Sequence, residues 1–111
     1  MNLKIEKNGN ITVATLSGAF DHEDAPRLAD ELQPLVAASG ARLAIELSGL
    51  DNINSAGLSE LISVVTRARL AGSSVVLVAP SPFVQQVFSV TRLGDWFEIV
   101  ETVEAAAALE G

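Results

Sequence analysis

The chain has 111 residues, no cysteine, one histidine and a formal net charge of −7, from 7 basic and 14 acidic side chains. This length suits a single domain, the missing cysteines exclude disulfides and thiolate metal sites, and an acidic chain without a basic patch argues against nucleic-acid binding. No apolar run reaches the roughly 20 residues that span a bilayer, and no basic segment leads into an apolar N-terminal stretch, so we expect a cytoplasmic protein without metal or cofactor whose partner is another protein.

Two segments rich in β-branched residues begin the chain, Leu3 to Lys7 and Ile11 to Leu16. The intervening Asn8-Gly9-Asn10 is typical of a tight turn between strands. The N-terminal part of the chain is therefore predicted to be a β-hairpin.

The next segment has the features of an amphipathic helix. Acidic residues from Asp21 to Asp24 precede Pro26, which suits a first turn because acidic groups favour the positive end of a helix and proline needs no N–H there. Pro34 removes a backbone hydrogen bond, so it should kink or shorten the last turns before Ser39-Gly40 ends the helix. The apolar positions share one face and are Leu28, Leu32, Leu35 and Val36.

A strand, a loop and a second helix follow. The strand is predicted over Arg42 to Leu47, and Ser48-Gly49 marks its exit into a loop. The helix is predicted from about Ala56 to Ala71, closed by Gly72. Its core-facing positions have helical spacing, namely Leu58, Leu61, Ile62 and Val65. Val64 lies one step off this stripe, so truncating it should cost less stability than truncating Leu61.

Ser55 immediately precedes this periodic run. It is predicted to be the N-cap, with its hydroxyl accepting from the N–H of Gly57 or Leu58. The free N–H groups and the positive end of the helix dipole also favour an anion at this point. Ser55 is therefore either a cap alone or a cap that carries a phosphate, and Gly57, without a Cβ, leaves the first turn open to close approach by another molecule.

The C-terminal third continues the alternation of strands and helices. The apolar run Val75 to Ala79 predicts a strand covered on both faces. Ser81-Pro82 has the form of an N-cap and first helical residue, opening a short helix that Gly94 ends. Trp96 to Val100 is predicted to be a short edge strand or an extended segment, and Thr102 begins a last helix. The aromatic residues are expected in the core or covering an edge: Phe83, Phe88, Trp96 and Phe97.

This order of elements, β-β-α-β-α-β-α-β-α, predicts an α/β fold. The sheet should be mixed and have four to five strands, with an N-terminal hairpin and about four packed helices.

With these elements in order, the chain resembles a STAS domain, the fold of bacterial anti-sigma factor antagonists, over residues 1–111 as a single domain. Three short motifs carry the resemblance: Leu16-Ser-Gly-Ala-Phe-Asp21 with Ala25-Pro26-Arg27-Leu28, Leu43-Ala-Ile-Glu-Leu-Ser-Gly-Leu50, and Ile53-Asn-Ser-Ala-Gly-Leu58. In the family, the last motif carries the serine that becomes phosphorylated.

The resemblance places Ser55 at the phosphorylated position and Asp21 at the acidic position that the family holds close to it. Two residues depart from the family pattern: Asn54 stands where antagonists most often have aspartate, and Glu46 stands where the preceding strand usually has aspartate. The surface expected to bind the partner comprises Asp21, Asn54, Ala56, Gly57 and Ser59.

By the same resemblance, the unphosphorylated protein would bind an ATP-dependent serine kinase that is also an anti-sigma factor, and a serine phosphatase would restore binding after phosphorylation. The alternative is a STAS subunit of a larger assembly, such as a lipid-transport or stress-sensing complex, with Ser55 only a cap. Hydrolase chemistry is a weaker interpretation. Ser55, His22 and Asp21 supply the residue types of a triad, but no Gly-x-Ser-x-Gly motif accompanies them, so the protein is not expected to be an enzyme.

Overall fold

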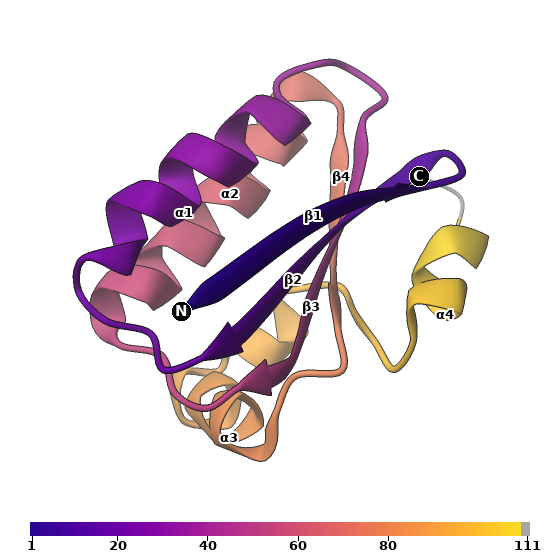
Figure 1. Ribbon diagram of the computed structural model, residues 1–111. Coiled ribbons are helices and arrows are strands. Elements are labelled where there is room, and N and C mark those ends of the chain that lie inside the picture. The colour runs from indigo at the N-terminus through magenta and orange to yellow at the C-terminus, as the bar shows by residue number, and fades with distance from the viewer. Residues whose placement is uncertain (110–111) are drawn as a thin grey trace.

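One five-stranded sheet forms the centre of the molecule (Figure 1). In the computed structural model, which describes residues 1–109, the strands follow the spatial order β1-β2-β3-β4-β5. The first pair is antiparallel and the other three pairs are parallel. This confirms the predicted mixed sheet. The strands are β1 (Asn2–Asn8), β2 (Ile11–Gly18), β3 (Arg42–Leu50), β4 (Ser74–Val78) and β5 (Ile99–Val100).

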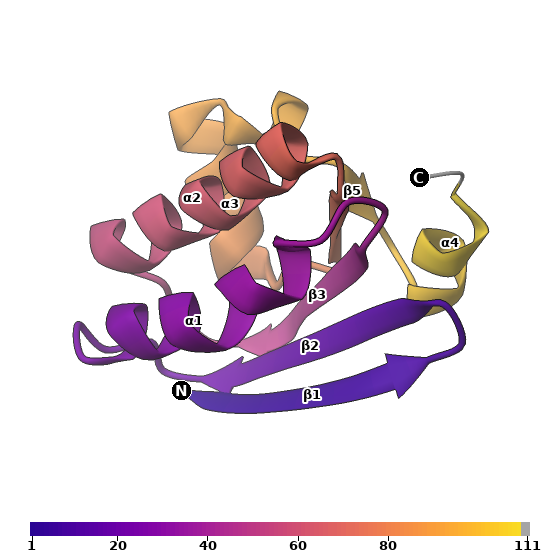
Figure 2. The ribbon, with the colours of Figure 1, turned by 90° about the horizontal axis from the view of Figure 1, so that it is seen from above.

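Helices cover the two faces of this sheet unequally. The helices are α1 (Asp24–Leu32), α2 (Ser55–Ala71), α3 (Pro82–Thr91) and α4 (Val103–Ala108), with 3-10 turns at Gln33–Val36 and Leu93–Asp95. Figure 2 shows α1, α2 and α3 on one face and α4 alone on the other. The larger core fills the first side, and a smaller core of six buried residues lies under α4: Ile11, Val13, Ala44, Val76, Val78 and Ala106.

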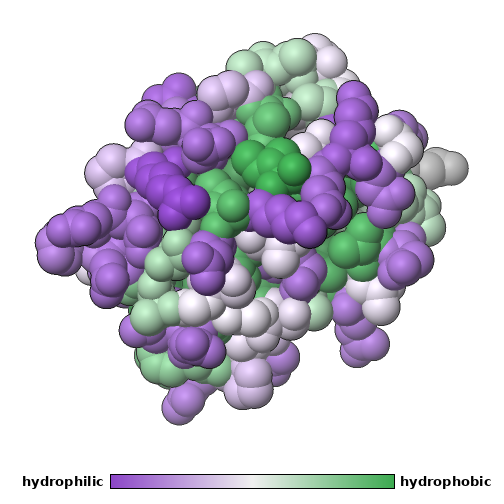
Figure 3. Space-filling model, in the orientation of Figure 1, coloured by the Kyte–Doolittle hydropathy of each residue, from purple (hydrophilic) through white to green (hydrophobic). Residues whose placement is uncertain are grey.

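The N-terminal hairpin closes on a two-residue turn. Asn8 pairs with Ile11 across Gly9 and Asn10, and Gly9 has a φ of +65°. A positive φ at the first turn position is tolerated by glycine without steric cost. The hairpin prediction is therefore confirmed. In the view of Figure 1, in which β1 lies in front, the molecular surface carries both hydrophilic and apolar areas (Figure 3).

The second strand of the parallel part is longer than predicted. β3 continues past Leu47 through Ser48 and Gly49 to Leu50, because its pairing with β2 resumes after a register shift that brings Gly49 opposite Ser17. A Cβ at Gly49 would lie 3.0 Å from the Ser17 Cβ. The Ser-Gly pair therefore marks a close strand contact and not the start of the loop.

The first two helices differ in how closely they follow the sequence prediction. α1 ends at Leu32, and Pro34 lies in the following 3-10 turn, as expected from its missing N–H. In α2, Leu61 and Val64 are both fully buried, so the prediction that Val64 lies off the buried face of the helix is wrong. The reason is that α2 packs against both the sheet and α1, which widens its buried face beyond a single stripe.

The end of α3 also departs from the prediction. The helix stops at Thr91, and Arg92 takes the left-handed conformation with φ +61°. Gly94, predicted to end the helix, lies in the following 3-10 turn. Phe83, expected in the core or covering an edge, is 45% exposed and does not belong to the core.

The segment after α3 contributes side chains to the core before the last strand begins. β5 contains only Ile99 and Val100, and Trp96 and Phe97 precede it. The Phe97 ring lies 5.0 Å from the Phe88 ring between centroids. The Arg69 guanidinium stacks over Trp96 at 4.3 Å from the ring centroid. Packing of the aromatic rings therefore takes the place of the longer strand that was predicted.

Arg42 connects β3 to α4, the helix on the less covered face of the sheet. Its Nη2 donates to the backbone carbonyls of Ala106, Ala107 and Leu109. The last carbonyls of a helix have no partner within the helix, and a cation is favoured there. Arg42 therefore holds the C-terminal end of α4 against the sheet.

Candidate functional site

Two loops meet where β2 and β3 end. The backbone N–H of Phe20, after β2, donates to Asn52 Oδ1, after β3, over 2.7 Å. Both loops leave the carboxyl ends of parallel strands, where open α/β sheets commonly place their functional residues. In the sequence, Asn52 falls in the loop predicted between the strand and the second helix. The tendency of asparagine to hydrogen-bond backbone groups was the available signal, but the sequence does not show which backbone N–H would donate to it.

Asn54, and not Ser55, caps α2. Its Oδ1 accepts from the Gly57 N–H at 2.9 Å, and its backbone is extended, with φ −100° and ψ 179°. Its carbonyl accepts from the Leu58 N–H at 2.9 Å. The N-cap prediction for Ser55 is therefore wrong by one residue. Asparagine and serine are similarly good N-caps, so the sequence alone did not show which of these two neighbours caps the helix.

Ser55 is the first residue of α2, and its side chain is exposed. Ala56 and Ser59 are also exposed, and Ser55 and Ser59 lie four residues apart on one face of the helix. The N-terminal turn of α2 thus presents two hydroxyl groups toward solvent. Since Asn54 supplies the cap, the helix does not depend on the Ser55 hydroxyl.

Gly57 is buried, in contrast to the open position predicted for it. A Cβ at this residue would lie 2.6 Å from Phe20 Cε1 and 2.8 Å from Ile53 Cγ1. Real Cβ atoms do not approach carbon atoms so closely. The close approach that Gly57 permits is therefore made by Phe20 of the same chain, which fixes the first turn of α2 onto the loop after β2.

Asp21 follows Phe20 and is exposed. Its backbone N–H donates to Asp24 Oδ2 over 2.8 Å, and the N-terminal amine of Met1 lies 3.2 Å from the same oxygen. The hydrogen bond from Asp21, reinforced by the Met1 amine, lowers the pKa of the Asp24 carboxyl. Within residues 1–109 no hydrogen bond joins Asp21 to Ser55. Their two segments are related through Phe20, which packs against Gly57 and donates to Asn52 Oδ1.

Glu46, the other residue that departs from the family pattern, lies within β3 and is half-buried. Its Oε1 accepts from the Ser48 N–H, two residues further along the strand, over 2.6 Å. The surface around the loops is acidic, because exposed carboxylates follow both strands: Asp21, Glu23 and Asp51.

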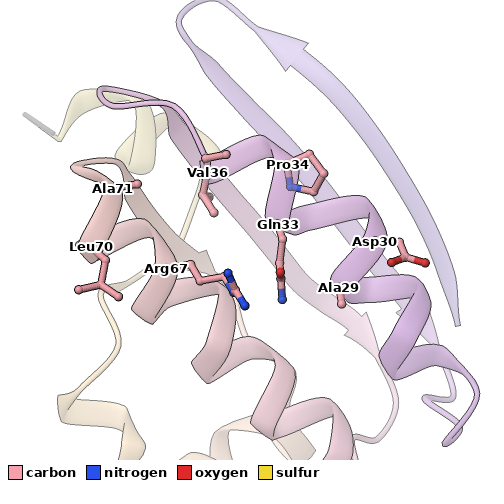
Figure 4. Close-up of a pocket in the computed structure, with 9 residues that line it drawn as sticks. Ala29, Asp30, Gln33, Pro34, Val36, Arg67, Leu70 and Ala71 are labelled. Atoms are coloured by element: carbon pink, nitrogen blue, oxygen red, sulfur yellow. The ribbon is translucent and has the colours of Figure 1, made fainter.

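A groove of about 600 Å³ lies between α1 and α2, far along α2 from Ser55 (Figure 4). Gln33 and Arg67 point into the space between the helices, and Asp30 points away from it. Gln33 Nε2 donates to Glu60 Oε1 over 2.8 Å. The groove is therefore bounded by paired helix side chains and does not extend to the N-terminal turn of α2.

In the described part of the chain, no group of three histidine or acidic side chains gathers in a way that would hold a metal ion. Among the helices of residues 1–109, none has both the length and the apolar character to cross a membrane.

Comparison with known proteins agrees with the fold. The model of the STAS domain family matches residues 2–106. The candidate anti-sigma factor antagonist BtrV of Bordetella bronchiseptica is 32% identical over 108 residues, which is 97% of this chain and 93% of BtrV.

Solved structures of similar fold extend this comparison. An anti-sigma factor antagonist from Mycobacterium paratuberculosis superposes with a TM-score of 0.83 at 25% identity, covering 96% of this chain and 90% of that one. SpoIIAA in its unphosphorylated form has a TM-score of 0.79 at 22% identity over 96% of this chain and 93% of its own. Phosphorylated Bacillus SpoIIAA has a TM-score of 0.73 at 21% identity over 96% of each chain. The family match over nearly the whole chain, together with the predicted sheet and motifs, shows that this protein belongs to the STAS domain family.

Proposed function

We propose that this protein is a cytoplasmic anti-sigma factor antagonist, without enzymatic activity of its own, that acts as a phosphorylation-controlled partner switch at Ser55. The observation that carries the proposal is an exposed serine at the first position of α2 whose hydroxyl the helix does not use as a cap. The names of BtrV and of the Mycobacterium paratuberculosis protein support the general role. SpoIIAA, which shares the fold, has been solved both with and without phosphate.

The proposed partner is an ATP-binding serine kinase that also serves as an anti-sigma factor. It would contact the two loops and the start of α2 through four exposed residues, Asp21, Ser55, Ala56 and Ser59, and the half-buried Asn54. Gly57 would act indirectly, because its missing side chain lets Phe20 pack against the first turn of α2 and fix its position. Binding of the antagonist would release the other client of the kinase.

Phosphorylation would end this interaction. The Ser55 Oγ attacks the γ-phosphorus of ATP held by the kinase, the bond to the β-phosphate oxygen breaks, ADP leaves and the hydroxyl proton passes to a base of the kinase. The phosphoserine adds a charge of about −1.5 to −2 to a surface that already carries Asp21 and Asp51. A phosphatase would restore the hydroxyl by hydrolysis.

The added phosphate should affect binding more than folding. The N-terminus of α2 and its free N–H groups can stabilise an anion by up to about 2 kcal/mol, so the folded state should survive. A partner packed against Ala56 would have to bury or repel that anion. Loss of a switch-like interaction requires a hundredfold weaker binding, which is about 2.7 kcal/mol.

Calorimetric titration against the cognate kinase tests the proposal. Protein phosphorylated enzymatically at Ser55 should bind at least about a hundredfold more weakly than the Ser55→Ala variant, while thermal melts of the two free proteins remain similar. Intact mass spectrometry should show one added phosphate, absent in Ser55→Ala and retained in the matched control Ser59→Ala. Equal binding by phosphorylated protein would favour a structural STAS subunit of a larger assembly, and a phosphate on Ser59 or Ser63 would overturn the assignment of Ser55.

A further inference from the structure

Within residues 1–109, no strand pairs with the outer edge of β1. This strand is the outermost one on its side of the sheet (Figure 2), and most of its seven residues are exposed. β5, at the other edge, has two residues. A long edge strand presents a row of backbone N–H and C=O groups that another strand can pair with. The outer edge of β1 is therefore a surface on which another strand could pair.

The hairpin turn determines which residues of β1 direct their backbone groups outward. Across a two-residue turn, the closing pair Asn8 and Ile11 exchanges hydrogen bonds, and hydrogen-bonded positions then alternate along the strand. Even-numbered residues of β1 therefore bond to β2. The outward groups belong to Leu3, Ile5 and Lys7.

When β1 of one copy of the chain pairs with β1 of a second copy, the charged side chains favour one register over the others. Antiparallel pairing of two copies about a two-fold axis at Ile5 places Lys4 of each copy opposite Glu6 of the other, so that two ion pairs form across the strands. Registers centred on Lys4, Glu6 or Lys7 place like charges opposite one another, which is unfavourable. A register centred on Leu3 overlaps only the first part of the strand. The Ile5 register also joins Leu3 to Lys7 and Ile5 to Ile5 through their outward backbone groups.

The charge of β1 differs from that of the whole chain. Both lysines of the sequence, Lys4 and Lys7, lie in this strand together with one carboxylate, Glu6, whereas the chain has a net charge of −7. Repulsion between two acidic molecules is therefore reduced at this edge. Lys4 Nζ and Glu6 Oε1 lie 2.8 Å apart within one chain, and their side chains are 73% and 62% exposed, so both are accessible to a second copy.

From these observations we propose that β1 is a dimerisation surface, on which two copies of this chain pair antiparallel about Ile5 to form one continuous sheet. Ile5, 37% exposed in the single chain, meets its counterpart on the face that carries α1. Ser55 lies at the start of α2, away from the β1 edge (Figure 2). The dimer would therefore carry two separate Ser55 sites.

Sedimentation equilibrium with charge-reversed variants tests the ion pairs. Lys4→Glu and Glu6→Lys each place like charges across the two-fold axis, so each should raise the dimer dissociation constant by about tenfold or more. An equimolar mixture of the two variants should regain a dimer near wild-type strength, because each then faces the opposite charge. Restoration on mixing separates the contact between chains from the pair within one chain. A wild-type monomer at every accessible concentration, or a mixture that remains monomeric, would overturn the proposal.

A single-cysteine experiment tests the register, since the chain has no cysteine of its own. Hydrogen-bonded antiparallel partners have Cα atoms about 5.5 Å apart, within the range that a disulfide bridges. Ile5→Cys should therefore form a covalent dimer under mild oxidation. In the control Leu3→Cys, the two thiols would be about 14 Å apart along the strands and should stay reduced. Equal cross-linking of both variants would contradict a register centred on Ile5.

Discussion

Asn54 bears the structural role that the sequence pattern suggested for Ser55. Its amide oxygen accepts from the Gly57 N–H, so Asn54→Ala should lower the free energy of unfolding by about 1 kcal/mol, the typical cost of a lost N-cap. Ser55→Ala should change it by less than about 0.5 kcal/mol, as for exposed positions. Urea denaturation of both variants measures the two effects, with Asn54→Ser as a control that keeps an acceptor. Equal losses at both positions would mean that Ser55 also contributes to the cap.

Gly57 is expected to be sensitive to even a single methyl group. Gly57→Ala places a Cβ 2.6 Å from the Phe20 ring, and overpacking of this kind costs roughly 1–3 kcal/mol. Gly94→Ala is the matched control, because a Cβ there meets no atom within 4 Å. Thermal melts should show a lower midpoint for Gly57→Ala and a nearly unchanged one for Gly94→Ala. A neutral Gly57→Ala would show that Phe20 can move away from α2.

For single residues, the sequence indicated where α2 begins but not which residue caps it or which residue packs against its first turn. Ser55 was correctly placed at the start of a helix because periodic apolar residues begin three positions later. The contact between Phe20 and Gly57 joins residues 37 positions apart in the chain. Local propensities carry no information about such a pair, and this is why Gly57 was expected to face a partner.

Among the elements, α2 allows a direct test of how wide its buried face is. Leu61 and Val64 are both fully buried. Leu61→Ala should cost about 2–5 kcal/mol through cavity formation, and Val64→Ala about 1.5–3 kcal/mol through lost apolar burial. Leu70→Ala, at a position 84% exposed, is the control and should be nearly neutral. Urea melts that show a loss at Leu61 but none at Val64 would restore the single-stripe face predicted from helical spacing.

Element boundaries were predicted best where a local signal determines them. The turn at Gly9, the proline after α1 and the left-handed Gly72 after α2 act within a few residues, so the sequence pattern revealed them. The extension of β3 through Gly49 depends on pairing with Ser17 in β2. The end of α3 at Arg92 adopts a conformation that glycine would favour, so Gly94 was a misleading signal.

In the whole molecule, the two faces of the sheet should differ in stability. Three helices cover one face, whereas a six-residue helix covers the other, and Arg42 bonds the carbonyls at its end. Helices this short depend on tertiary contacts. We therefore predict that α4 opens locally, with amide hydrogen exchange faster than that of α2.

Arg42→Met tests the origin of this difference. The variant keeps an apolar stem but removes the donors to the α4 carbonyls, so exchange in α4 should accelerate while exchange in α2 stays the same. Hydrogen exchange followed by mass spectrometry measures both segments in one sample. Equal acceleration in α2 and α4 would show that the two faces unfold as one unit and that α4 has no separate opening.

Capping by Asn54 and the proposed phosphorylation of Ser55 are tasks of two different residues, and this has a consequence for how the sequence can evolve. Folding requires a capping side chain at position 54 but makes no comparable demand for the hydroxyl at position 55. Under the proposed function, selection for a stable domain and selection for a regulated one act on neighbouring codons and not on the same one. A descendant that lost the proposed kinase would then be free to drift at position 55 while position 54 stayed constrained, so the two positions would record separately whether a lineage has kept the fold and whether it has kept the proposed signal.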